Sequence, residues 1–111
     1  MPTLTLHLRR HLLACAVVAA IAGCSGERTE AEYLGSAATY VAENKHAAAI
    51  IEYKNALQQN PRNVDSRLAL AASYLAVGDA AGAEKELRRA AELGASSEQV
   101  LPSLVRALNL Q

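Results

Sequence analysis

Segment 70–95, LAASYLAVGDAAGAEKELRRAAELGA, repeats the pattern of segment 36–61, SAATYVAENKHAAAIIEYKNALQQNP. Large and small apolar residues recur in the two segments at an interval of 34 residues. The matching pairs are Tyr40 and Tyr74, Ala49 and Ala83, Tyr53 and Leu87, and Ala56 and Ala90. A fixed interval of this length is typical of helical repeats, in which each helix–turn–helix unit stacks on the next. The interval therefore predicts an all-α solenoid.

Turn and capping residues divide each repeat into two helices. Asn44 and Gly78, which are 34 residues apart, tolerate the left-handed backbone that ends a helix. Thr29 and Glu32 have the spacing of a capping box. The other candidate N-caps are Asn63, Asp79 and Ser97. Together these signals predict helices at about 30–43, 46–59, 64–77, 80–93 and 98–110.

The pattern resembles the tetratricopeptide repeat, whose first helix carries a large residue, Leu-Gly and Tyr, and whose second carries Ala, an aromatic residue, Ala and Pro. The matching or conservatively replaced positions are Tyr33, Ala37, Tyr40, Ala49, Tyr53, Ala56 and Pro61, then Leu70, Ala71, Tyr74, Gly78, Ala83, Leu87 and Ala90. Ser36, Arg67 and Ala95 depart from it. The resemblance implies repeat 1 at 30–63, repeat 2 at 64–97 and the first helix of an incomplete third repeat at 98–111. The alternative is an unrelated pair of alanine-rich helical hairpins.

The N-terminus predicts a targeting segment outside the repeats. Arg9 and Arg10 precede an uncharged apolar run of 11 residues at 12–22. This run is shorter than the roughly 20 residues that span a bilayer, but it suits a signal peptide. It ends in Ile21, Ala22, Gly23 and Cys24, which resemble the bacterial lipobox. The alternative is an ordinary secretory peptide that contains a cysteine by chance.

The lipobox resemblance implies that residues 1–23 are removed and that Cys24 is acylated. Several acyl chains make a stable membrane anchor. Residues 24–29 would then form a short lipidated tether. Because Ser25 is not Asp, the resemblance implies transport to the outer membrane of a Gram-negative bacterium, with the repeats facing the periplasm. Cys15 would leave with the signal peptide, so no disulfide is expected.

The sequence favours a binding protein over an enzyme. The 11 basic and 11 acidic residues give no net charge, so no nucleic-acid partner is expected. No set of catalytic side chains, phosphate-binding loop or metal-ligand spacing is found after Cys24, so neither a cofactor nor a metal is expected. A hydrolase or transferase subunit is the alternative that these observations oppose.

The repeat resemblance also places residues on a groove that could bind an envelope protein or peptide. These positions, which are small or apolar with one exception, are Leu34, Ala38, Val41, Ala42, Asp65, Leu68, Ala72, Leu75 and Ala76. Their alternative role is packing between helices, because an apolar helical stripe ordinarily faces a core. Residues 84–92 predict a solvated face of mixed charge, with Glu84 and Arg88 as a favourable pair.

The predicted helix at 98–110 carries an apolar side made by Leu101, Leu104, Val105 and Leu108. Repeat arrays normally end in a helix with a polar outer face. The apolar side therefore predicts self-association through this helix, or a chain that is part of a longer array and has no function of its own.

The combination of lipobox, tether and repeats resembles the start of the repeat lipoproteins of the PEP-CTERM/exosortase system. That resemblance implies a scaffold linked to exopolysaccharide export or protein sorting. A second resemblance is to the pilotin lipoproteins, which help to assemble type IV pilus secretins.

Overall fold

The computed structural model describes residues 26–111, so the predicted signal peptide, the lipobox and Cys24 lie outside the described residues. The described part is all-α and contains no strand. Its five helices are α2 (Glu30–Ala42), α3 (His46–Gln59), α4 (Val64–Ala76), α5 (Ala80–Glu92) and α6 (Ser97–Asn109). Each helix begins and ends within one residue of its predicted range. None of the helices in residues 26–111 is long and apolar enough to cross a membrane.

Local side-chain hydrogen bonds explain where most of these helices begin. Thr29 Oγ1 accepts a bond from the Glu32 N–H, and the Glu32 carboxylate accepts one from the Thr29 N–H at 2.7 Å, which confirms the capping box. Asn63 caps α4 through a 2.9 Å bond from the Ser66 N–H, and Asp79 caps α5 through a 2.8 Å bond from the Gly82 N–H.

The prediction for the last helix is wrong by one residue. Ser96, and not Ser97, caps α6. Ser96 Oγ accepts from the Gln99 N–H, and Gln99 Oε1 accepts from the Ser96 N–H at 3.0 Å. Ser97 cannot form such a reciprocal pair, because the residue three positions after it is Val100.

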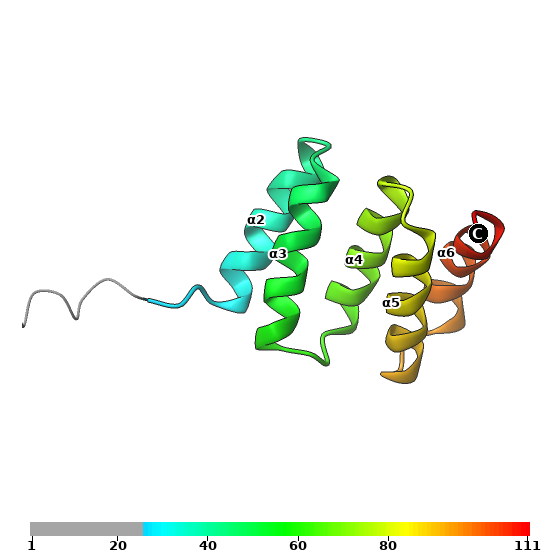
Figure 1. Ribbon diagram of the computed structural model, residues 1–111. Coiled ribbons are helices and arrows are strands. Elements are labelled where there is room, and N and C mark those ends of the chain that lie inside the picture. Colours follow the sequence, from blue (N-terminus) through cyan, green and yellow to red (C-terminus); the bar gives the residue numbers. More distant parts are fainter. Residues whose placement is uncertain (1–25) are drawn as a thin grey trace, which may run out of the picture.

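The helices lie side by side in chain order, each antiparallel to the next (Figure 1). Left-handed residues make the turns inside the two repeats, with φ values of 58° at Asn44 and 83° at Gly78. Each helix packs against its neighbours in the chain, and α4 also contacts α6. These contacts build a stack of helical hairpins, which is the predicted solenoid.

Two hydrophobic clusters hold the stack together. The first contains Ala37, Ala49, Tyr53, Leu57 and Leu70, and the second contains Ala71, Leu75, Ala83, Leu87, Val100 and Ala107. The alanines at 37, 49, 71 and 83 are 0% exposed. Their single methyl groups let neighbouring helices approach closely, while the larger members fill the remaining space.

The end of the predicted tether is attached to repeat 1. The Arg28 guanidinium lies 4.4 Å from the centre of the Tyr33 ring, a cation–π geometry. It also forms an ion pair with Glu52 of α3 at 2.9 Å. The described end of the predicted tether is therefore held against α2 and α3 through Arg28.

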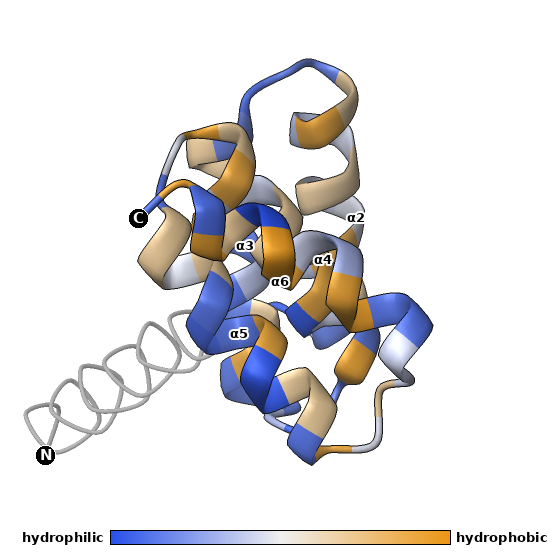
Figure 2. Ribbon diagram, turned by 90° about the vertical axis from the view of Figure 1, so that its right-hand side faces the viewer, coloured by the Kyte–Doolittle hydropathy of each residue, from blue (hydrophilic) through white to orange (hydrophobic). Residues whose placement is uncertain are grey.

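One side of α6 is apolar and exposed. Leu101 and Val105 are each 53% exposed, and Leu108 is 47% exposed. Ala71 and Ala37 occupy the same repeat position as Val105, one and two 34-residue intervals earlier in the chain. Both are 0% exposed because a second helix packs on them. Figure 2 views the stack from this end and shows hydrophobic segments along α6. Among residues 26–111 no element covers this side of α6, and self-association through it stays a prediction.

Candidate binding surface

The first helices of the two repeats present a row of small and apolar side chains. Ala38, Val41 and Ala72 are exposed, and Leu34 and Leu68 are partly buried. We call these five residues the inner surface. The two further groove positions Ala42 and Ala76 are also exposed. The placement of Leu75 in the groove is wrong, because Leu75 is only 5% exposed and belongs to the cluster that contains Leu87 and Val100.

A hollow of about 290 Å³ adjoins the inner surface at Leu34. Its lining comes from α2, α3 and the first residues of α4. The lining residues are Leu34, Tyr53, Asn63, Asp65, Ser66 and Ala69. Of these six residues, the sequence analysis had placed only Leu34 and Asp65 on the groove. We call this cavity the hollow.

The polar side chains that line the hollow differ in whether they form hydrogen bonds. Both polar atoms of the Asn63 side chain form hydrogen bonds: its Oδ1 accepts from the Ser66 N–H and caps α4, and its Nδ2 donates to the Glu30 carboxylate at 2.6 Å. Ser66 is 2% exposed, and its Oγ has no hydrogen-bond partner among the described residues. Burial raises the pKa of the Tyr53 hydroxyl above its ordinary value, so this group stays protonated at neutral pH. Ser66 is thus a buried residue beside the hollow whose hydroxyl makes no hydrogen bond among the described residues.

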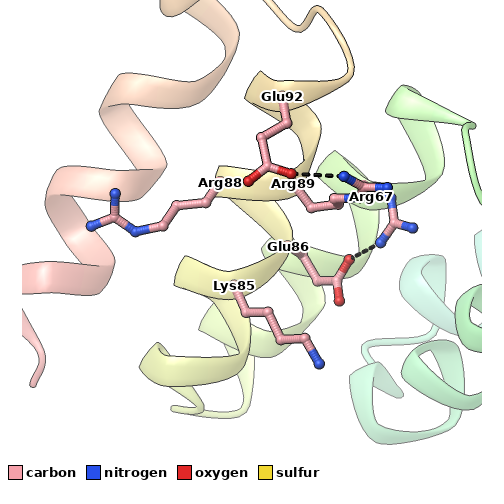
Figure 3. Close-up of a pocket in the computed structure, with 6 residues that line it drawn as sticks. All are labelled: Arg67, Lys85, Glu86, Arg88, Arg89 and Glu92. Atoms are coloured by element: carbon pink, nitrogen blue, oxygen red, sulfur yellow. Dashed lines mark hydrogen bonds and ion pairs between the residues drawn. The ribbon is translucent and has the colours of Figure 1, made fainter.

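A second cavity of about 530 Å³ lies against α5 and is lined by charged residues. They are Arg67, Lys85, Glu86, Arg88, Arg89 and Glu92, and we call this cavity the charged cleft. Figure 3 shows Arg67 and Glu86 pointing toward each other, whereas Arg88 points away from them. Arg88 pairs with Glu84 at 2.7 Å, as predicted, and Arg89 pairs with Glu92 at 2.7 Å.

The ion pair between Arg67 and Glu86 corrects the prediction of a wholly solvated face. Arg67 Nη1 lies 2.6 Å from Glu86 Oε2, and the two side chains are only 13% and 11% exposed. Arg67 also donates two bonds to the Pro61 carbonyl, from Nη2 at 2.7 Å and from Nε at 3.1 Å. Arg67 therefore joins the turn between the repeats to α5. The sequence signal for this buried ion pair was that Arg67 stands where the repeat pattern has a large apolar residue.

In residues 26–111, no group of three His, Cys, Asp or Glu side chains is arranged to hold a metal ion. Burial is the main cause that raises the pKa of the Tyr74 hydroxyl, with further contributions from the Glu86 and Asp79 charges. This shift stabilises the neutral phenol, which is the state of an ordinary packed tyrosine.

Comparison with known proteins agrees with this geometry. The family model described as Tetratricopeptide repeat matches residues 40–108, which run from within α2 almost to the end of α6. No curated protein and no solved structure matches the chain. The family match covers most of the chain, and its span includes both intra-repeat turns. The 34-residue interval, the stacked helical hairpins and this match together show that the chain belongs to the tetratricopeptide repeat family.

Proposed function

We propose that this chain is a scaffold that binds another protein through its inner surface. Tetratricopeptide repeats mediate protein–protein interactions and typically act as non-catalytic scaffolds, which supports a protein partner. The observation that carries the proposal is the exposure of Ala38, Val41 and Ala72 along two neighbouring first helices. Small apolar side chains leave room for a bound segment to approach the helix backbone, and they gain from being removed from water.

The scaffold is anchored in a membrane through acylated Cys24. The lipobox residues Ile21, Ala22 and Gly23 support this proposal, as does the apolar run that precedes them. A short anchor would hold the repeats close to the lipid surface, because Arg28 is already attached to α2 and α3. With Ser25 after the cysteine, the outer membrane is the proposed location.

The scaffold serves exopolysaccharide export or the sorting of PEP-CTERM proteins. This part of the proposal rests on the resemblance of the lipobox, tether and repeats to the lipoproteins of that system. The exposed side of α6 supports a role within a larger assembly, since an apolar face of this kind is normally covered by another surface.

Metabolic labelling with an alkynyl fatty acid tests the anchor. The full chain should incorporate the label, and Cys24→Ala should abolish incorporation, because an acyl chain needs the thiol of this residue. Cys15→Ala is the matched control and should keep the label, since residue 15 lies inside the segment that is removed. Label that persists in Cys24→Ala would refute the anchor.

A further inference from the structure

We propose that the second helices of the two repeats frame a further binding surface, a groove that takes an acidic segment of a partner protein. The groove has a volume of about 290 Å³ and is lined by α3, α4 and α5. In Figure 1, α4 lies between α3 and α5, and it packs on both of them. The lining residues that carry the inference are Lys54, Leu57, Arg67, Tyr74, Lys85 and Glu86, and we call this cavity the outer groove.

The outer groove and the inner surface lie on opposite sides of α4. Arg67 and Tyr74 line the outer groove and are two helical turns apart, so they share one face of α4. Ala72 of the inner surface precedes Tyr74 by two residues, which at about 100° per residue turns it to the opposite side of the helix. The outer groove is therefore a surface beyond the proposed function, and it can be occupied while the inner surface holds another partner.

Two lysines without an acidic partner flank the outer groove. Lys54 comes from α3 and Lys85 from α5, and both are exposed. Among residues 26–111, neither lysine forms an ion pair. Figure 3 shows Lys85 extending to the same side of α5 as Glu86, whereas Arg88 extends to the other side. The two ammonium groups are thus open to a ligand in this groove.

The charge of the lining favours an anionic ligand. Arg67 is the third cation, and it already pairs at 2.6 Å with Glu86, the one acidic residue of the lining. The outer groove thus has three basic residues and one acidic residue, whereas residues 26–111 as a whole have nine basic and eleven acidic residues. Basic charge is concentrated here against the balance of the described chain, and a cleft with charge of one sign attracts ligands of the other sign.

The remaining lining favours a polypeptide as the source of the negative charge. Leu57 is 9% exposed and Tyr74 is partly buried, so both still offer apolar surface to the groove. A phosphate ion or a lipid headgroup brings no apolar group to cover this surface. A peptide that alternates acidic and apolar side chains supplies carboxylates for Lys54 and Lys85 and an apolar group for the space between them.

An NMR titration of the full chain in micelles of a neutral detergent tests the outer groove. The probe is the blocked peptide Glu-Leu-Glu-Leu-Glu, and one reference peptide has Gln in place of every Glu. The probe should shift the amide signals of Lys54, Leu57 and Lys85 and leave those of Ala38 and Ala72 unchanged. It should bind at least about tenfold more tightly than the Gln peptide, which lacks the charge-assisted bonds.

A second reference peptide, with Ser in place of Leu, tests the apolar part of the groove. It should bind at least about threefold more weakly than the probe, because it removes less apolar surface from water.

Three variants make the test specific. Lys54→Gln and Lys85→Gln should each weaken the probe about three- to fivefold, the effect of removing one exposed ion pair. Lys45→Gln is the matched control and should leave binding unchanged, because Lys45 lies outside the groove and pairs with Glu43 at 2.7 Å. Lys54→Gln and Lys85→Gln should unfold at the same temperature as the wild type, since neither lysine has an ion pair to lose among residues 26–111.

Four results would overturn the outer groove as a site for an acidic segment. They are equal binding of the probe and the Gln peptide, full binding in the double variant of Lys54→Gln and Lys85→Gln, signal shifts confined to Ala38 and Ala72, and tighter binding of glycerophosphoglycerol than of the probe. The last of these would identify the surface as a contact for anionic lipid headgroups.

Discussion

Replacing Leu87 by alanine is expected to lower the free energy of unfolding by about 2–5 kcal/mol, the range for deleting a buried leucine side chain. Leu87 is 1% exposed and lies in the cluster that joins α4, α5 and α6. Three of the six buried members of that cluster are alanine, whose side chains are too short to move into the space that the deleted atoms leave. A domain is typically stable by only about 5–15 kcal/mol, so this one change should remove a large share of it.

Urea denaturation followed by circular dichroism measures the effect on a chain that begins at Ser25. The matched control is Leu108→Ala, which deletes the same atoms from a residue that is 47% exposed. The control should cost less than about 1 kcal/mol, because it leaves no closed cavity. A loss below about 1 kcal/mol in Leu87→Ala as well would mean that Leu87 is not buried in solution, and would contradict the assigned core.

Replacing Glu86 by alanine is expected to cost about 3 kcal/mol, near the lower end of the range for breaking a buried ion pair. The lower end applies because about a tenth of each side chain still meets water, with exposures of 13% for Arg67 and 11% for Glu86. The change leaves the guanidinium with only the Pro61 carbonyl as a partner in this contact. The junction between the repeats should therefore loosen.

Two further variants separate a buried pair from a surface pair. Glu92→Ala removes the partner of Arg89, and because these side chains are 63% and 50% exposed the loss should stay within about 1 kcal/mol. The double variant Arg67→Met with Glu86→Leu should recover most of the stability, since an apolar pair of similar volume replaces the charges. If Glu86→Ala costs no more than Glu92→Ala, the Arg67–Glu86 contact is not buried in solution.

The helices were predictable because their signals are local. The caps and the left-handed turns each depend on residues within one or two turns of helix, and the 34-residue interval repeats such local signals along the chain. The start of α6 shows the limit of such reasoning. Ser96 and Ser97 are equally good caps as single residues, and only the bond that the Ser96 N–H donates to Gln99 Oε1 decides between them.

The binding features were less predictable because they combine distant residues. The Arg67–Glu86 pair joins positions 19 residues apart on different helices. The hollow takes its lining from three helices, so no single stretch of sequence carries its pattern. Leu75 shares its helix with the exposed Ala72, and its burial in the cluster with Val100 depends on the packing of α6. Periodicity finds a face of a helix, but tertiary packing decides which part of that face stays open.

Photo-crosslinking of the full chain in its source cells tests the scaffold most directly. The photoreactive residue p-benzoylphenylalanine replaces Ala72 or Ala38 on the inner surface, and Ile51 of α3, which is 60% exposed, is the control position. Both inner positions should yield a discrete adduct with another protein, and position 51 should yield none. The absence of an adduct at both inner positions, or the same adduct at position 51, would contradict binding through the inner surface.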